Sequence, residues 1–455
     1  MFKYGTSVKA YADSRMSENI TSKNLWKSCS CDCSELEMVK GEDLTFVIGE
    51  VSVPCLEENS EYAIRVTESG VAVRGKDYNS LLRGFSVLCL KIGFADLHKG
   101  KESFYIPDAE YQGKYKISNR MIHFCVFPET DYEIIRKYIR LAGIMQYTHV
   151  VLELWGMIKY DCLAELSWDN AFTKDQVKEL VAEIRGFGME PIPMFNQLGH
   201  ATASRSCSGK HVVLDRNPRL SYLFTPDGWS WDVSSDEVFA LLKAVRKELC
   251  EVFGDGEYFH IGCDEAYFYV RSDEHRKLLP GYLKKLTDEV VKEGRRPMMW
   301  MDMLLPPMGD GYCTFAKPEE ADMLNSSINP ATVAVDWQYD VNTAPLKSSL
   351  YLKDKGFDVM GAPWFNYGNI KAHVATVCDN NLFGIMETTW HTVPTKIHSI
   401  VFCAKNCGAA TFDWATTGDT SLMVFGEETA TLLRKVAFET LPYELCGWLK
   451  DQVTL

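Results

Sequence analysis

The chain lacks several features that would assign it to a class of protein at once. It has no apolar run long enough to span a membrane. Its 48 basic residues are outnumbered by 62 acidic ones, which gives a net charge of −14. Because nucleic acids and anionic membranes bind basic surfaces, we expect neither as the main partner. The first seven residues lack the apolar core of a signal peptide, so we expect a cytoplasmic protein.

Regular cysteine spacing is also missing, although the chain has 15 cysteines. Cys29, Cys31 and Cys33 alternate in a polar segment, but no second Cys or His pair follows at the spacing of a zinc finger. Free thiols in a reducing compartment are the simpler interpretation. We therefore expect no structural metal, and no other cofactor is predicted.

At 455 residues the chain can form one large barrel with an attached domain. Residues 1–115 are predicted to form a small α+β domain, with a strand at 44–51, a hairpin at 62–66 and 71–74, and a helix at 79–92. Residues 116–410 are predicted to form the second domain. Residues 411–455 are expected to add a helical extension that packs on it.

The second domain alternates strands with helices. Eight apolar strands are predicted, at 121–126, 149–154, 190–194, 257–262, 297–300, 332–335, 358–361 and 382–386. Helices are predicted at 132–145, 176–187, 238–253 and 283–293, and three capping boxes are predicted: Thr130 with Glu133, Thr173 with Gln176, and Ser234 with Glu237. Eight such repeats predict an α/β fold, a (β/α)8 TIM barrel. An open doubly wound sheet is the alternative, but no Gly-x-Gly-x-x-Gly turn follows an early strand.

The segment from Tyr258 to Ala266 is the most informative stretch. An apolar run ends in His260, then a glycine, then Asp264 and Glu265. Neighbouring side chains of a strand point to opposite faces, so these two carboxylates can serve one site only where the strand stops. Two adjacent carboxylates also shift each other's pKa, which lets one remain a protonated acid. The alternative interpretation is a solvated acidic turn after a core strand.

Polar and aromatic residues stand at the other strand ends, where a barrel carries its chemistry. Five of the 11 tryptophans lie there, which predicts an aromatic-walled pocket of the kind that stacks on sugars. The candidate substrate-binding residues are Arg120, near the beginning of the first strand, and, at the strand ends and in the loops after them, Glu153, His200, His260, Trp300, Trp337, Tyr339, Trp364, Tyr367 and Trp390.

These residues resemble glycoside hydrolase family 20, the β-N-acetylhexosaminidases. Residues 260–265 are similar to the family's His-x-Gly-x-Asp-Glu motif, and Pro193 through His200 resembles its Pro…Gly-His segment after the third strand. The N-terminal unit resembles the small domain that precedes many bacterial barrels of the family. Residues 192–200 and the Cys-Asp-Glu form are most similar to the hexosaminidase D branch. Three tryptophans and an arginine also fall at family positions: Trp300, Trp337, Trp390 and Arg120.

The resemblance implies a substrate-assisted mechanism, an exception to the usual two-carboxylate scheme. Glu265 is then the general acid, Asp264 orients the 2-acetamido N–H, and Tyr367, ahead of Tyr339, holds the acetamido carbonyl. The implied substrate is a small glycan with a terminal β-linked GlcNAc or GalNAc, removed by exo-action with retention.

The chain also departs from the family pattern. Met194 and Asn196 stand where the family often has Glu and Asp, and Trp390 is followed by His391 and Thr392 where it often has Trp-x-Glu. Those missing carboxylates contact sugar hydroxyls in the family, so the departures bear on which hexose is preferred.

Two other functions fit the same residues less well. One is a metal-dependent barrel hydrolase with His200, His260 and Asp264 as ligands, although no tight His-x-His pair occurs at a strand end. The other is a non-catalytic protein that binds N-acetylhexosamine. Such a protein would have no need of the proton donor Glu265.

Overall fold

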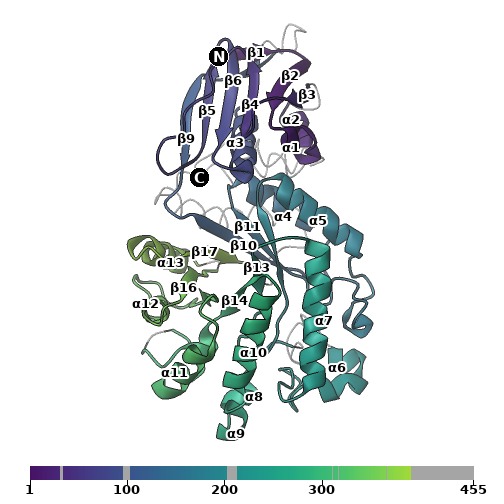
Figure 1. Cartoon of the computed structure of the whole chain (residues 1–455), viewed down its shortest axis with the longest axis vertical. Helices are drawn as coiled ribbons and strands as arrows, with labels where there is room; N and C mark the ends of the chain where they lie inside the picture. Colours follow the sequence, from purple (N-terminus) through teal and green to yellow (C-terminus); the bar gives the residue numbers. More distant parts are fainter. Residues whose placement is uncertain are drawn as a thin grey trace.

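The computed structural model describes residues 1–390, except for 31–33, 96–102, 202–212 and the single residues 310, 316 and 365. The described chain forms an N-terminal α+β domain and a barrel below it in the view of Figure 1. The predicted C-terminal extension at 411–455 lies outside the described residues. So do Cys31, Cys33 and His391.

The N-terminal domain contains a six-stranded sheet in the order β3-β2-β4-β6-β5-β9 and a three-stranded sheet in the order β1-β8-β7. Three aromatic residues, Trp26, Phe46 and Phe85, pack between the helices and the larger sheet and are fully buried. The strands are β1 (Phe2–Tyr4), β2 (Ser7–Ala12), β3 (Glu35–Lys40), β4 (Thr45–Gly49), β5 (Ser60–Thr67), β6 (Gly70–Gly75), β7 (Gly93–Ala95), β8 (Ser103–Ile106) and β9 (Ala109–Lys114); the helices are α1 (Ser14–Ser17), α2 (Ile20–Cys29) and α3 (Tyr78–Leu90).

The barrel confirms the predicted fold class. Each strand from β10 to β16 pairs in parallel with the next one, and β17 pairs back with β10, which closes the sheet. Closure rules out the open doubly wound alternative. The strands are β10 (Asn119–Cys125), β11 (His149–Glu153), β12 (Glu190–Met194), β13 (Tyr258–His260), β14 (Arg296–Trp300), β15 (Val333–Asp336), β16 (Asp358–Gly361) and β17 (Gly384–Thr388).

The barrel interior is a packed core. Alternate residues of each strand point inward, and Met121, Val151, Met298, Val335 and Met386 meet there as one buried apolar cluster. Because side chains fill the centre, the barrel is not a pore, and any site must lie at its rim.

Helices between the strands begin close to their predicted positions. Thr173 and Gln176 form the predicted capping box of α5. The other two predicted caps are wrong by one residue, because Asp131 caps α4 and Ser235 caps α7. The helices are α4 (Tyr132–Ile144), η2 (Ala164–Leu166), α5 (Lys174–Gly186), α6 (Val213–Arg216), η3 (Pro218–Leu223), α7 (Asp236–Phe253), α8 (Tyr267–Val270), α9 (Asp273–Arg276), α10 (Leu279–Lys292), η4 (Asp302–Leu304), α11 (Pro318–Ser327), α12 (Lys347–Asp354) and α13 (Tyr367–Asp379).

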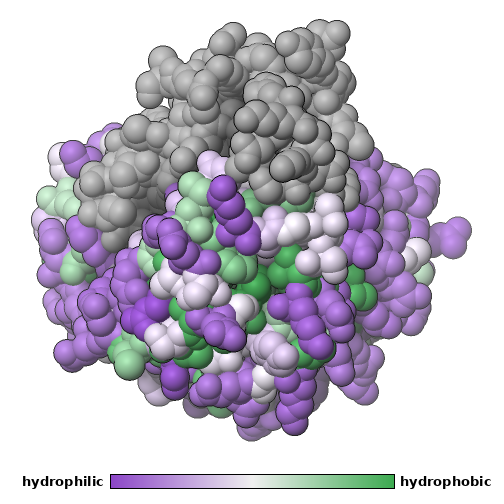
Figure 2. Space-filling view, turned by 90° about the horizontal axis from the view of Figure 1, so that it is seen from above, coloured by the Kyte–Doolittle hydropathy of each residue, from purple (hydrophilic) through white to green (hydrophobic). Residues whose placement is uncertain are grey.

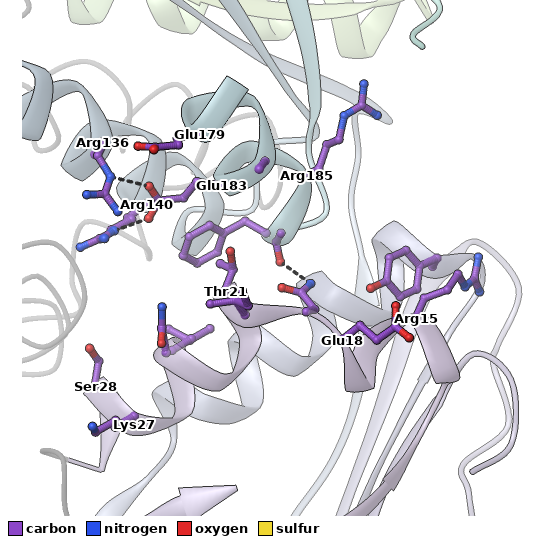
Figure 3. A pocket seen from close by; sticks show the side chains of 18 residues that line it. Arg15, Glu18, Thr21, Lys27, Ser28, Arg136, Arg140, Glu179, Glu183 and Arg185 are labelled. Carbon is purple, nitrogen blue, oxygen red and sulfur yellow. Dashed lines mark hydrogen bonds and ion pairs between the residues drawn. The ribbon is translucent and has the colours of Figure 1, made fainter. Parts of the chain in front are cut away.

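The N-terminal domain packs against the barrel through α2, α3, α4 and α5. Asn19 at the start of α2 donates a hydrogen bond of 3.1 Å to the carbonyl of Gly186. Beside this contact lies a cavity of about 820 Å³, into which Arg136, Arg140 and Glu183 project (Figure 3). Both arginines pair with Glu183, at 3.0 and 2.5 Å, and Arg136 pairs with Glu133 as well, at 3.2 Å.

One face of the described molecule is predominantly polar. Seen from above, hydrophilic side chains cover most of the coloured face, and apolar ones gather near its centre (Figure 2). None of the helices in the described ranges is long and apolar enough to cross a membrane.

Candidate active site

Asp264 and Glu265 lie just beyond the end of β13, in a segment that turns sharply before α8. Cys263 and Glu265 have φ angles of 78° and 49°, in the left-handed region that non-glycine residues rarely adopt. Because the backbone turns here, the side chains of Asp264 and Glu265 no longer alternate between opposite faces as they would in a strand. Both carboxylates can therefore serve one site. Asp264 is buried, whereas the side chain of Glu265 is 23% exposed. The inner carboxylate can therefore hold a substrate group while the outer one meets a leaving group.

His200 joins the two carboxylates from the loop after β12. Its Nε2 lies 2.9 Å from Oε2 of Glu265 and 3.3 Å from Oδ2 of Asp264. Gly199 makes this approach possible, because a Cβ at that position would lie 1.8 Å from the carbonyl oxygen of Asp264. The structure thus brings three of the predicted site residues together.

Asp302 is a fourth member of this cluster that the sequence interpretation did not include. Its Oδ2 accepts hydrogen bonds from the backbone N–H of Glu265 at 2.9 Å and from Oγ1 of Thr314 at 3.1 Å. Its Oδ1 accepts the indole N–H of Trp337 at 3.3 Å. Burial, and next the negative charge of Asp264, raise the pKa of Asp302 to about 8. Asp302 therefore fixes the backbone of Glu265 while largely protonated at neutral pH.

Aromatic residues form a wall along the same rim. Trp300 is fully buried at the end of β14 and packs 5.4 Å from Trp390, centroid to centroid. Tyr339 lies 5.3 Å from Trp337 and 5.5 Å from Trp364, and both distances again join ring centroids. The other four aromatic residues of the wall are half-buried, so they are partly accessible to a ligand: Trp337, Tyr339, Trp364 and Trp390.

The hydroxyl of Tyr339 lies in this pocket and takes part in two hydrogen bonds. It accepts hydrogen bonds from the indole N–H of Trp390 at 2.6 Å and from Oγ1 of Thr388 at 3.4 Å. Burial raises the pKa of Tyr339 far above its ordinary range, so the phenol stays protonated. Thr388 also donates its hydroxyl to the carbonyl oxygen of Pro363 at 2.9 Å, so the indole of Trp390 is the closer partner of the phenol.

Glu153 and His260 occupy buried positions beneath the wall. Glu153 accepts a hydrogen bond of 2.8 Å from the amide of Asn196, and it also bonds His123 and the indole of Trp155. The ring of His260 packs 4.5 Å from Trp300. That either residue contacts a sugar remains a prediction. In the structure, Glu153 contacts Asn196 and His260 contacts Trp300.

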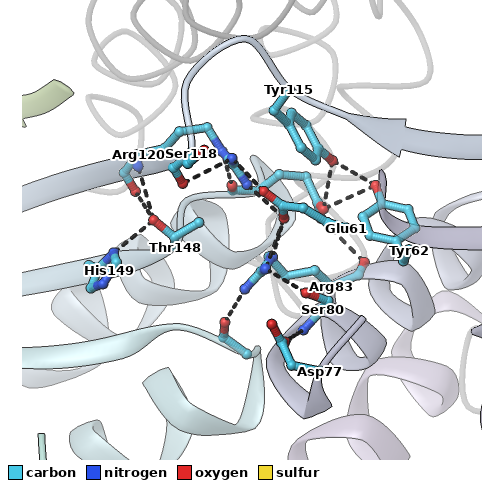
Figure 4. A network of polar contacts seen from close by, with 12 residues as sticks. Glu61, Tyr62, Asp77, Ser80, Arg83, Tyr115, Ser118, Arg120, Thr148 and His149 are labelled. Atoms are coloured by element: carbon cyan, nitrogen blue, oxygen red, sulfur yellow. Dashed lines mark hydrogen bonds and ion pairs between the residues drawn. The ribbon is translucent and has the colours of Figure 1, made fainter. Parts of the chain in front are cut away.

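The interpretation of Arg120 as a substrate-binding residue needs correction. Arg120 stands near the beginning of β10, at the barrel end opposite the carboxylates. It is fully buried and pairs with Glu61 of the N-terminal domain at 2.8 Å (Figure 4). Arg83 binds the same carboxylate, also at 2.8 Å. The charge of Arg120 is thus used to join the two domains.

Tyr367 is described only as the first backbone position of α13, so its predicted contact with the acetamido group is a prediction still. The proposed metal triad also lacks support from contacts. His200 bonds carboxylates, whereas Nδ1 of His260 accepts the backbone N–H of Gly262 at 3.1 Å. Among the described residues there is no group of three or more His, Cys, Asp and Glu side chains placed to hold a metal ion.

Residues 148–323 match the model of the catalytic domain of glycosyl hydrolase family 20. This stretch contains β11–β14 and all members of the carboxylate cluster. This part of the chain therefore resembles the catalytic domain of glycosyl hydrolase family 20.

Solved family 20 structures share the whole described architecture. The exo-β-N-acetylglucosaminidase of Vibrio harveyi, in complex with N-acetylglucosamine, has a TM-score of 0.68 and 13% identity over 96% of this chain and 75% of that one. The β-N-acetylhexosaminidase of Streptomyces coelicolor A3(2) has the same score and identity over 96% and 93%. At this identity the likeness establishes a common fold.

A curated relative matches over only a small part of its own length. The lacto-N-biosidase of Bifidobacterium bifidum is 22% identical over 266 residues, which make up 51% of this chain and 23% of the relative. The matched region is therefore about a quarter of the length of that protein.

Proposed function

We propose that this chain belongs to family 20 and is a retaining exo-β-N-acetylhexosaminidase that removes terminal β-linked GlcNAc or GalNAc from small glycans. The observation that carries the proposal is the cluster of Asp264, Glu265 and His200, held within hydrogen-bond reach of one another at the rim of the barrel. An inner and an outer carboxylate beside an aromatic wall suit a substrate that supplies its own nucleophile.

In the first step the acetamido carbonyl oxygen of the substrate attacks C1. The bond from C1 to the glycosidic oxygen breaks, and that oxygen takes the proton of Glu265. Asp264 accepts the acetamido N–H, which polarises the amide and turns its oxygen toward C1. The products of this step are the departed alcohol and an oxazolinium ion.

In the second step Glu265, now a carboxylate, accepts a proton from water. The water oxygen attacks C1 and opens the oxazolinium ring, which restores the acetamido group. C1 is inverted once in each step, so the product keeps the β configuration.

Tyr339 supports the attacking oxygen in this scheme. Its protonated hydroxyl can donate to the acetamido carbonyl, while Trp390 and Thr388 hold the phenol oxygen in place. The surrounding tryptophans exclude water and pack on the apolar faces of the bound sugar. Tyr339 is therefore our first choice for this role, ahead of Tyr367.

The test is the hydrolysis of aryl β-N-acetylglucosaminide and aryl β-N-acetylgalactosaminide by the wild-type chain, with and without a chelator. Glu265→Gln should lower kcat by roughly 100-fold to 10,000-fold, the usual contribution of a general acid. Glu274→Gln, at an exposed position of α9, is the matched control and should retain wild-type turnover.

Each outcome has a clear meaning. Turnover that survives chelation and fails in Glu265→Gln supports the mechanism, and the ratio of the two substrates gives the sugar preference. Binding of N-acetylhexosamine by a folded wild-type chain without turnover of either substrate would instead support a sugar-binding protein.

A further inference from the structure

Two phenols are linked in series to the carboxylate of Glu265, and the proposed mechanism does not use them. Tyr267 is the first residue of α8, and its phenol hydrogen-bonds the carboxylate of Glu265. The hydroxyl of Tyr312 donates in turn to that of Tyr267 at 3.2 Å. Because the oxygen of Tyr267 accepts this proton, its own proton is directed at Glu265. We call Tyr267 and Tyr312 the phenol chain.

The local backbone holds Tyr267 beside Glu265. The N–H of Tyr267 donates to the carbonyl of Glu265 at 2.7 Å, and the indole N–H of Trp229 donates to the same carbonyl at 2.8 Å. Both members of the phenol chain are half-buried. Hydrogen bonds at positions shielded from water are stronger than those in bulk solvent. The contact between Tyr267 and Glu265 is therefore suited to act on the charge of the carboxylate.

The place of Tyr312 is fixed from the loop after β15. The side-chain amide of Gln338, a buried residue, accepts the backbone N–H of Tyr312 and donates to its carbonyl at 2.9 Å. The ring of Tyr312 stacks on that of Trp337, with centroids 5.1 Å apart and an angle of 27°. Gly311 permits this approach, because its φ is 75° and a Cβ there would lie 2.3 Å from Oε1 of Gln338. Tyr312 is thus placed by contacts that do not involve Glu265.

Both members of the phenol chain keep their protons at neutral pH. Burial, and next the hydrogen bond to Glu265, raise the pKa of Tyr267 far above its ordinary range. Burial likewise raises the pKa of Tyr312 to about 12. Tyr267 therefore remains a hydrogen-bond donor to Glu265 whether that residue is a carboxyl group or a carboxylate.

A constant donor matters at the moment when Glu265 loses its proton. In the first step of the proposed reaction Glu265 becomes a carboxylate, and a hydrogen bond to the charged form stabilises it. We propose that Tyr267 is a positioning residue that holds Glu265 and stabilises its carboxylate, and that Tyr312 acts on Glu265 only through Tyr267. This role rests on the proposed function of Glu265 as the general acid.

Other charged or titratable groups face Glu265 from the neighbouring elements. Asp264 precedes it in the chain, His200 comes from the loop after β12, and Asp302 comes from η4. A pH profile of the enzyme therefore belongs to the whole cluster. The substitution of Tyr by Phe removes one hydroxyl and changes no charge, so the difference between two such profiles reports the phenol.

The test is the pH profile of kcat/KM on an aryl β-N-acetylglucosaminide for the wild type, Tyr267→Phe, Tyr312→Phe and the double variant. Without the hydroxyl of Tyr267 the carboxylate is less stable, so Glu265 keeps its proton to a higher pH. The alkaline limb of Tyr267→Phe should move up by about one pH unit, and its plateau should fall roughly tenfold. Tyr312→Phe should move the limb less, in the same direction. It should add nothing to Tyr267→Phe, because the phenol chain is then already broken.

Tyr269→Phe is the matched control from the same helix. Tyr269 is buried, and its hydroxyl donates to the carbonyl of Trp231 at 2.6 Å and accepts the N–H of Val233 at 2.9 Å. Its loss removes hydrogen bonds to the backbone and none to Glu265. The alkaline limb of Tyr269→Phe should therefore coincide with that of the wild type, even where its unfolding midpoint falls.

The outcomes separate this role from the proposed function. Wild-type turnover with an alkaline limb that stays in place or moves down in Tyr267→Phe overturns the positioning role and leaves the proposed function standing. A limb that moves equally in Tyr269→Phe overturns the role as well. An equal shift by Tyr312→Phe with and without the hydroxyl of Tyr267 overturns the series arrangement of the phenol chain. No turnover by the folded wild-type chain overturns the proposed function, and the role of Tyr267 with it.

Discussion

His200 provides the most informative perturbation of the carboxylate cluster. The substitution His200→Asn keeps a residue type that tolerates the φ of 52° found there, so the backbone gains little strain. The shorter side chain cannot reach Glu265, however, and the contacts of 2.9 and 3.3 Å are lost. A hydrogen bond to a charged group contributes about 1.5–3 kcal/mol. Loss of one such bond in the transition state lowers kcat roughly 10-fold to 150-fold.

The assay measures kcat on aryl β-N-acetylglucosaminides with a good and a poor leaving group. Because His200 positions the acid, His200→Asn should slow the poor leaving group more, since that group depends most on protonation. His275→Asn is the matched control: its ring bonds Ser272 at the edge of α9, so wild-type kinetics are expected. An equal loss for both leaving groups, or a rise in KM at unchanged kcat, would refute this role.

Three further predictions concern the framework of the site. Glu61→Ala leaves two buried arginines without their carboxylate and should lower the free energy of unfolding by about 3–5 kcal/mol, as measured by urea denaturation. The control is Glu110→Ala, which removes an exposed ion pair and should lower the free energy of unfolding by at most about 1 kcal/mol. Gly199→Ala places a Cβ against backbone and should abolish turnover, whereas Gly281→Ala, which meets no neighbour, should behave like the wild type in the same assay. Because the pKa of Asp302 is raised to about 8, the folded state binds the extra proton between about pH 4 and 8, and stability falls as the pH rises through that window. Asp302→Asn should remove this decline in unfolding free energy, and an equally steep decline in the variant would contradict the assignment.

The Glu61 network adds a pH dependence of the opposite sign. Burial alone would raise the pKa of Glu61, but attraction and hydrogen bonds from Arg120 and Arg83 outweigh it and lower the pKa. The stabilisation is therefore present above the ordinary carboxyl pKa and is lost as the pH falls through the lowered one. Acid titration of Glu61→Ala should lack that loss.

Much of the barrel could be predicted from the sequence because its strands are short apolar runs separated by strong helix signals. The predicted strand at 190–194 coincides with β12, and the helix after Thr173 begins at its predicted capping box. The caps of α4 and α7 were placed one residue early, because adjacent Thr130 and Asp131, or Ser234 and Ser235, are equally good caps and tertiary packing chooses between them.

The candidate site was predictable only in part. Asp264 and Glu265 form a motif within six residues, so local sequence reveals them. Asp302 is part of no such motif, and its contact with the backbone of Glu265 exists only because β13 and β14 are neighbours. Arg120 was misassigned from the family resemblance, although its position near the beginning of β10 puts it at the end of the barrel away from the carboxylates. Its partner, Glu61, lies 59 residues away in another domain.

The dependence on the acetamido group tests the central claim most directly. The measurement is kcat/KM of the wild-type chain for an aryl β-N-acetylglucosaminide and for the matching aryl β-glucoside, which has a hydroxyl in place of the acetamido group. If Asp264 orients an intramolecular nucleophile beside Glu265, the first substrate should react roughly a thousand-fold faster or more. Comparable rates for the two substrates would contradict the account.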